Sequence, residues 1–342
     1  MANFRILSYN VKLYTLIADE CEKRAEQIGD IIVDKDYDVV CLQEVFSEDP
    51  RDILAEKLEQ NGYNVIAKCG GPVLIPQDSG LFFASKFPIR SHNFEHFRML
   101  SGEIVNYDAL AAKGFLRVSL DLSGIMSNLN LIVYNTHFQA DYGTKRNSVD
   151  IINRETFLES VSELERRNME QEAALLINSY DYSNFDSDEC ELVSGLSAQT
   201  KQRILEILQY IESYSGVRNK ELNRIKESIY SIKFNGESKN TGMILCGDLN
   251  IDGRRQSNIE YKEFKSDFIN EFTGKDSFEN NPDVITSRGD GGCRYDYILT
   301  LNKVNEYELN NLTVVNGKVD IEQRQLSDHY GICSEISAEN IV

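Results

Sequence analysis

The sequence predicts a mixed α/β fold, an α/β or α+β sandwich. Short β-branched or alternating runs, typical of strands, dominate the first third of the 342-residue chain and return in its last third. Patterns typical of amphipathic helices lie between the early runs. Both ends of the chain are therefore expected to build the same type of core.

The early elements alternate between strands and helices. The strands predicted in the first third are Phe4–Tyr9, Val39–Leu42, Leu81–Ser85, Phe115–Leu120 and Leu129–Asn135. Helices are predicted at Glu20–Asp34 and Arg51–Gln60, and the first presents Ala25, Ile28, Ile31 and Ile32 on one face. The later strands are predicted at Met243–Cys246, Arg294–Leu299, Leu312–Val315 and Ile332–Ile336.

The middle of the chain, about residues 141–240, has a different composition, rich in Glu, Arg, Asn and Ser. Ile151–Ile177 and Ala198–Ile232 have the pattern of long amphipathic helices, separated by the acidic, turn-like stretch Asp181–Glu191. We interpret this segment as a helical insertion in a single domain that spans residues 1–342. It is either a solvated helical pair or a lid or partner-binding platform.

Composition limits the classes of function. Lys and Arg number 36 against 55 Asp and Glu, which gives a net charge of −19. This balance argues against nucleic acid as the main partner, because duplex binding depends on basic residues that neutralise phosphates. No run of about 18 apolar residues is present, which argues against a transmembrane segment.

The seven cysteines contain no C-x-x-C pair, so we expect free, mostly buried thiols. The N-terminus enters a strand-like run at once, without the features of a signal peptide. These observations fit a cytoplasmic protein, or a secreted one whose signal has been removed.

Several predicted strands end in residues that can bind metal or phosphate. Phe4–Tyr9 leads to Asn10, Val39–Leu42 to Glu44, and the strand ending at Asn135 to His137. Further polar groups of this kind are Asp248 and Asn250 after Met243–Cys246, Asp296 in a late strand, and Asp328 and His329 before the last strand. If neighbouring strands share a sheet edge, these groups converge on one site.

Each of these residues also has an ordinary structural interpretation. Asn10 or Glu44 alone fits a polar loop residue. His92 and His96 lie in a polar, surface-like strand and are expected to be structural. His137 and His329 follow an apolar strand or flank a carboxylate, which favours a functional role.

The ordered set resembles the endonuclease/exonuclease/phosphatase superfamily, and within it the neutral sphingomyelinases. The elements that carry the resemblance are Ser8-Tyr9-Asn10-Val11, Leu42-Gln43-Glu44-Val45-Phe46, Ser79-Gly80-Leu81, Ser85-Lys86-Phe87-Pro88-Ile89, Lys113-Gly114-Phe115, Thr136-His137-Phe138-Gln139-Ala140, Gly247-Asp248-Leu249-Asn250, Tyr295-Asp296-Tyr297-Ile298 and Leu326-Ser327-Asp328-His329-Tyr330. The Glu-Val-Phe, Ser-Lys-Phe-Pro-Ile, Lys-Gly-Phe and His-Phe-Gln-Ala elements are those that point to the sphingomyelinase branch.

The resemblance implies a four-layer α/β sandwich, with two packed mixed sheets flanked by helices. It also implies hydrolysis of a phosphoester with Mg²⁺ or another divalent cation such as Mn²⁺ or Co²⁺. Glu44 would bind the metal, Asn10 would assist through its amide oxygen, and Asp328 would ligate a metal or position its neighbour. The implied partner is a phospholipid at a membrane surface.

The resemblance assigns the remaining roles as follows. His329 would be the general base on water, held by Asp296. His137, partnered by Asp108, would stabilise the transition state or protonate the leaving group. Asp248 would orient the water or the metal, and Asn250 would donate to phosphoryl oxygens.

Two departures and several alternatives remain. The aromatic hairpin that bacterial sphingomyelinases insert into membranes is not recognisable, and the chain has no tryptophan. A nuclease or a phosphoinositide phosphatase would use the same machinery. The non-enzymatic alternative is a binding module with an inactive inherited site.

Overall fold

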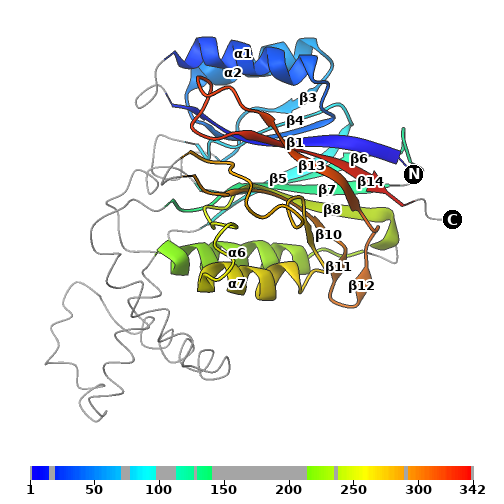
Figure 1. The fold of residues 1–342 in the computed structure, drawn as a ribbon. Helices are drawn as coiled ribbons and strands as arrows, with labels where there is room; N and C mark the ends of the chain where they lie inside the picture. Colours follow the sequence, from blue (N-terminus) through cyan, green and yellow to red (C-terminus); the bar gives the residue numbers. More distant parts are fainter. Residues whose placement is uncertain are drawn as a thin grey trace, which may run out of the picture. The chain divides into compact units, whose positions relative to one another are not determined.

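Two six-stranded β-sheets form the centre of the structure, a computed structural model (Figure 1). It describes residues 2–14, 20–70, 78–97, 113–126, 129–140, 214–234, 238–288 and 292–339. Residues Met1–Ala140 and Lys220–Val342 form one compact unit, and the description below concerns this unit.

The first sheet has the strand order β13-β14-β1-β2-β4-β3. Its strands are β1 (Ala2–Leu13), β2 (Val39–Val45), β3 (Asn64–Ile66), β4 (Phe82–Ser85), β13 (Thr313–Ile321) and β14 (Gly331–Ala338). Strands β1 and β2 are parallel, and β14 runs antiparallel to β1. The two ends of the chain thus pair at the centre of this sheet.

The second sheet has the order β5-β6-β7-β8-β10-β9. Its strands are β5 (Ile89–His96), β6 (Gly114–Asp121), β7 (Asn130–His137), β8 (Thr241–Asp248), β9 (Lys275–Asp276) and β10 (Asp296–Leu301). Strands β7 and β8 are parallel, whereas β10 is antiparallel to β8. Strands β11 (Lys303–Val304) and β12 (Tyr307–Glu308) form a separate two-stranded ribbon.

Helices cover the outer faces of both sheets (Figure 1). The helices are α1 (Cys21–Asp34), α2 (Glu48–Gln60), α6 (Tyr214–Tyr230) and α7 (Ile259–Phe264), with a 3-10 turn at Ser238–Asn240 and a π-helical turn at Lys265–Ile269. Helices α1 and α2 lie over the first sheet, and α6 and α7 lie over the second. The structure is the four-layer α/β sandwich that the resemblance implied.

Three apolar clusters separate the layers. Between the sheets, Phe4 and Ile6 of β1 belong to the same buried apolar cluster as Val133 of β7. The alternate residues Leu7 and Tyr9 of β1 point to the other face and pack with α1 and α2. Because both faces of the central strands are buried, their sequences are apolar on both sides.

The predicted helical insertion falls largely outside the described residues. The predicted helix Ile151–Ile177 lies wholly outside them, whereas α6 lies within the predicted range Ala198–Ile232. Leu222, Ile225 and Ile229 of α6 pack against the second sheet.

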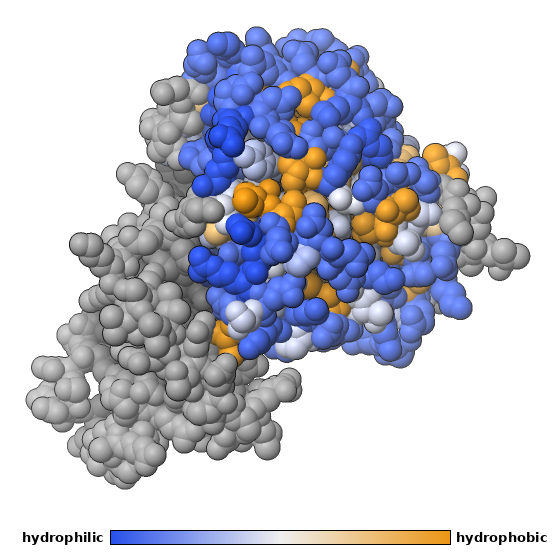
Figure 2. Space-filling model, viewed as in Figure 1, coloured by the Kyte–Doolittle hydropathy of each residue, from blue (hydrophilic) through white to orange (hydrophobic). Residues whose placement is uncertain are grey.

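The surface of the described residues is largely hydrophilic on the face that Figure 2 shows. Their exposed large hydrophobic side chains are Ile125, Ile285, Tyr307 and Val315. None of the helices in the described ranges has the length and apolar character needed to cross a membrane. The cysteines described at six positions are all free and buried, as expected from the sequence.

Candidate active site at one edge of the sandwich

Three polar residues form a row across adjacent strands of the second sheet. In the parallel pair β7 and β8, His137 lies opposite Asp248. In the antiparallel pair β8 and β10, Asp296 lies opposite the same Asp248. The ends of β7 and β8 and the start of β10 therefore place three titratable side chains side by side.

The first sheet contributes a second group at the same edge. Parallel β1 and β2 place Asn10 opposite Gln43, and Glu44 follows directly. Strand β14 runs antiparallel to β1 and begins at Gly331, so His329 lies just before it at the corresponding edge. The contacts described next join this group to the row on the second sheet.

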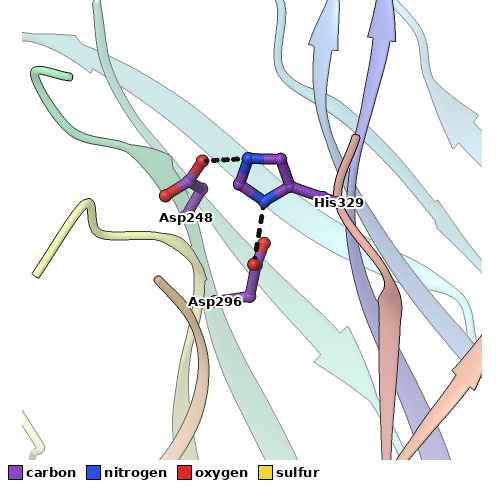
Figure 3. Close-up of side chains that lie close together, drawn as sticks. All are labelled: Asp248, Asp296 and His329. Carbon is purple, nitrogen blue, oxygen red and sulfur yellow. Dashed lines mark hydrogen bonds and ion pairs between the residues drawn. The ribbon is translucent and has the colours of Figure 1, made fainter. Parts of the chain in front are cut away.

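His329 is held between two carboxylates (Figure 3). Its Nδ1 lies 2.9 Å from Asp296 Oδ2, and its Nε2 lies 3.6 Å from Asp248 Oδ2. Burial opposes protonation of His329, but the charges of Asp296 and Asp248 outweigh it and raise its pKa to about 10. Burial also raises the pKa of Asp248 to about 7, against the opposing charge of His329.

Asn10 joins the carboxylates of the two sheets. Its amide nitrogen Nδ2 donates to Glu44 Oε1 at 2.7 Å and to Asp248 Oδ2 at 3.0 Å. The Nε2 atom of His137 lies 3.9 Å from the same Glu44 oxygen and 3.7 Å from the same Asp248 oxygen. Burial raises the pKa of Glu44, whereas the Asn10 hydrogen bond favours its ionised form. The two acids thus converge on one small polar centre.

The backbone around this centre is strained at three non-glycine residues. Lys12, Glu44 and Asn250 have φ values of 49°, 59° and 52°, in the left-handed region. Such a conformation costs about 1–2 kcal/mol for an ordinary L-residue. Strain of this kind gathers at functional sites, where the surrounding structure maintains it.

Gly247 allows the close approach of β7 and β8 beside the site. Its φ is 149°, and a Cβ atom at this position would collide with the carbonyl oxygen of Thr136. Glycine alone avoids this clash. The residue therefore supports the register that brings His137 opposite Asp248.

A buried amide pair connects the two sheets beneath the site. Gln43 Nε2 donates to Asn135 Oδ1 at 2.8 Å, and Asn135 Nδ2 donates to the carbonyl oxygens of Leu42 and Phe82 at 3.1 and 3.0 Å. Gln43 and Asn135 are fully buried. They fix the strand of Glu44 against the strand of His137.

The loop that carries His329 has several partners that the sequence did not reveal. The Ser327 hydroxyl donates to Asn10 O at 2.7 Å and accepts from the His329 amide at 3.1 Å. Asp296, the partner of His329, is held in turn by Thr286, whose Oγ1 accepts from the Asp296 backbone amide at 3.1 Å. Lys12 was also missed, and its Nζ lies 2.5 Å from Asp328 Oδ2.

The structure thus gathers six of the predicted residues in one cluster: Asn10, Glu44, His137, Asp248, Asp296 and His329. Asn250 adjoins them. Its backbone nitrogen donates to Asp248 Oδ1 at 3.0 Å, and its side-chain Nδ2 donates to Phe138 O at 3.0 Å. Lys113 Nζ donates to the same Phe138 oxygen at 2.6 Å.

Among the described residues, the other histidines and acids singled out in the sequence are not part of this cluster. The side chain of Asp328 is 43% exposed, and its pair with Lys12 helps to keep its pKa below the usual value although burial opposes this. Asp108 lies outside the described residues. His92 and His96 lie on the edge strand β5, where the His96 ring packs against Phe94.

The chemistry of the donor set fits a hard divalent cation. Glu44 and Asp248 supply carboxylate oxygens that share one amide donor, and Glu44 retains 21% side-chain exposure. Asp248, Asp296 and His329 also have ligand atoms within 4.8 Å of one another. Since both His329 nitrogens face carboxylates, this second group more closely resembles an acid–imidazole–acid relay.

Residues 7–329 match the Endonuclease/Exonuclease/phosphatase family. The chain belongs to this family. The match includes the whole second sheet, most of the first and every residue of the cluster described above, and it confirms the family resemblance found in the sequence.

Two proteins of Dictyostelium discoideum are related in sequence. One, an uncharacterized protein, is 38% identical over 121 residues, which is 35% of this chain. The other, a sphingomyelinase, is 25% identical over 228 residues, or 64% of this chain. The matches span only 10% and 38% of the lengths of these relatives.

Solved structures share the fold. Sphingomyelinase C from Streptomyces griseocarneus is 18% identical with a TM-score of 0.55, and the match covers 98% of this chain and 99% of that one. A beta toxin variant from Staphylococcus aureus with bound magnesium ions is 16% identical with a TM-score of 0.55, over 97% and 99% of the two chains.

Proposed function

We propose that this protein is a divalent-metal-dependent phosphodiesterase that splits sphingomyelin into ceramide and phosphocholine. The observation that carries the proposal is the contact of His329 with both Asp296 and Asp248, next to the Asn10–Glu44 pair. A family member with a sphingomyelinase among its relatives and this donor set is suited to phosphodiester hydrolysis.

In this proposal Glu44 and Asn10 hold the metal, with Asp248 beside them. Mg²⁺ is the first candidate, because it prefers oxygen donors. When bound, the cation supplies positive charge that offsets the anionic oxygens of the phosphodiester. Asn10 now points its amide nitrogen at the carboxylates, while its Oδ1 accepts from the Lys12 amide at 3.2 Å. Use of the amide oxygen as a ligand would therefore require the side-chain amide to turn over.

His329 acts as the general base in this proposal. Asp296 fixes Nδ1, so that Nε2 is the atom that takes the proton from water. Without a cation, the two neighbouring acids keep His329 protonated at neutral pH, because its pKa is about 10. Positive charge bound nearby favours the neutral imidazole that a base requires. Asp248, 3.6 Å from Nε2, orients the attacking water.

His137 and Asn250 complete the proposed machinery. His137 Nε2 faces Glu44 and Asp248, where it stabilises the transition state or protonates the leaving alkoxide, with Asp108 as its proposed partner. One amide proton of Asn250 is bonded to Phe138 O, and an amide has a second for a phosphoryl oxygen. The pair with Lys12 favours a positioning role for Asp328.

We further propose that the whole chain forms one catalytic domain in which residues 141–240 are an insertion. The strands of both sheets come from the segments before and after it. The substrate would reach the site from a phospholipid surface.

The test is release of phosphocholine from sphingomyelin vesicles with Mg²⁺ or with EDTA, run beside plasmid nicking and phosphoinositide dephosphorylation. We expect Mg²⁺-dependent release without nicking, and no release by His329→Ala that remains folded. Nicking alone would replace the proposal with a nuclease. Absence of all three activities would favour an inactive binding module.

A further inference from the structure

Arg24 is a buried cation in an unusual position. It lies in the first turn of α1 and is only 8% exposed. None of the carboxylates in the described parts of the chain forms an ion pair with it. The first turn is the positive end of the helix dipole, where a cation is disfavoured. Burial, missing counter-charge and helix position all oppose this residue, so a simple packing role does not account for it.

The guanidinium instead donates to main-chain carbonyl oxygens. Nε lies 2.8 Å from Leu326 O, and Nη2 also donates to this oxygen. Nη2 lies 2.5 Å from Val11 O, and Nη1 lies 3.2 Å from Lys12 O. Arginine suits this task because its donors diverge from one rigid plane.

The three carbonyls belong to two segments that carry candidate site residues, the end of β1 and the connection between β13 and β14. Val11 and Lys12 follow Asn10 at the irregular end of β1, where the pairing with β2 shifts register. Leu326 is the last residue of the turn at residues 324–326, and His329 follows three residues later. Both segments therefore meet at one side chain, supplied by a third element.

The chain between these segments and the site is short and ordered. Ser327, next to Leu326, binds Asn10 O and the His329 amide through its hydroxyl. A displacement of Leu326 would therefore move Ser327 and His329 relative to Asn10. His329 lies 3.6 Å from Asp248, which Asn10 also contacts. The displacement would therefore change the position of the His329 ring relative to Asp248 and Asn10.

We propose that Arg24 is a positioning residue that clamps the loop of the base His329 to the Asn10 end of β1; its catalytic meaning rests on the function proposed above. Arg24 touches neither the substrate nor the reacting atoms in this assignment. Its contribution is to hold two segments, distant in sequence, at a fixed separation.

The test uses the full-length chain and two variants, Arg24→Met and Arg24→Lys. Lys23→Met is the matched control, because Lys23 is the exposed neighbour on the same helix. We expect Arg24→Met to lower kcat about 10- to 100-fold through misplacement of the base. KM should change less than about twofold, because no substrate contact is removed. Millimolar guanidinium chloride should restore part of kcat to Arg24→Met, whereas equal concentrations of NaCl should not.

Hydrogen–deuterium exchange then separates positioning from general stability. Peptides that contain residues 10–13 and 324–330 should both exchange faster in Arg24→Met, while peptides from β7 and β8 keep their wild-type rates. Arg24→Lys, which retains the charge but not the divergent donors, should show the same pattern more weakly. If Arg24→Met does not fold, the kcat and the exchange rates of Arg24→Lys test the proposal.

Wild-type kcat in both variants would overturn the proposal, and so would faster exchange spread evenly over all peptides. If the wild type hydrolyses no phosphoester, the proposed function is wrong, but the proposed structural role of Arg24 is not affected. The exchange pattern then decides whether Arg24 clamps the two segments.

Discussion

His329 and Asp296 form a 2.9 Å contact although His329 lies just before β14 of the first sheet and Asp296 begins β10 of the second. The contact fixes the His329 ring through Nδ1. We predict that Asp296→Asn lowers kcat at least about 100-fold, because the imidazole loses both its orientation and the charge that stabilises its protonated form. Initial rates at saturating substrate measure this effect, with thermal unfolding as the test of folding. A kcat within threefold of wild type would remove Asp296 from the mechanism.

The metal-free protein should lose stability as the pH rises from 7.5 to 9.5. The pKa of His329 is raised from 6.5 to about 10, so its stabilisation is complete below 6.5 and is lost as the pH rises through about 10. One proton corresponds to a slope of about 1.4 kcal/mol per pH unit. The pKa of Asp248 is raised from 3.8 to about 7. The stability that depends on protonated Asp248 is therefore lost mostly between pH 3.8 and 7, below the range from 7.5 to 9.5.

Urea unfolding in EDTA at several pH values measures that slope. His329→Gln should reduce it by about one proton, whereas the exposed His92→Gln on β5 should leave it unchanged. Equal slopes for wild type and His329→Gln would contradict the assigned pKa direction.

Mg²⁺ should stabilise the wild type against heat, and Glu44→Gln should abolish most of this shift. The physical reason is that the variant removes the more exposed of the two carboxylates that share Asn10. At Mg²⁺ about 100 times above Kd the stabilisation should reach about 2.7 kcal/mol. The control is Glu59→Gln, an exposed acid on α2. An undiminished shift in Glu44→Gln would place the ion elsewhere.

Asn135→Leu should destabilise the protein by about 2–5 kcal/mol. The change removes the Asn135 partner of two carbonyl oxygens and of Gln43 Nε2, which keeps only longer contacts with Cys41 O and Ser8 Oγ at 3.3 and 3.5 Å. A buried polar group that loses its partner costs about 1–3 kcal/mol. Urea unfolding measures the loss. The exposed Asn3→Ala, which removes a bond to Glu335, should stay within about 0.5 kcal/mol. A loss below 1 kcal/mol for Asn135→Leu would show that the bridge between the sheets is not essential.

The sequence predicts the central strands well, because residues such as those of β1 and β8 are apolar on both faces. The family and the four-layer sandwich are confirmed. Short strands such as β9 and β12 have only two residues and leave no periodic signal. Helix α7 was also missed, since its six residues are too few for a clear pattern.

The site could be predicted in part for a similar reason. Residues such as Asp248 stand out because a polar group directly follows an apolar strand. Lys12 and Thr286 lacked such a signal, since their roles depend on contacts with Asp328 and Asp296 that only the folded chain creates. The roles of the predicted residues remain predictions that the experiments above address.

The parallel register of β7 and β8 has an evolutionary consequence. His137 and Asp248 are aligned by ladder hydrogen bonds between their own strands, whatever length of chain connects them. New sequence can thus accumulate in that connection without displacing these two side chains. The strand register, and not the length of the connection, then keeps this imidazole beside this carboxylate.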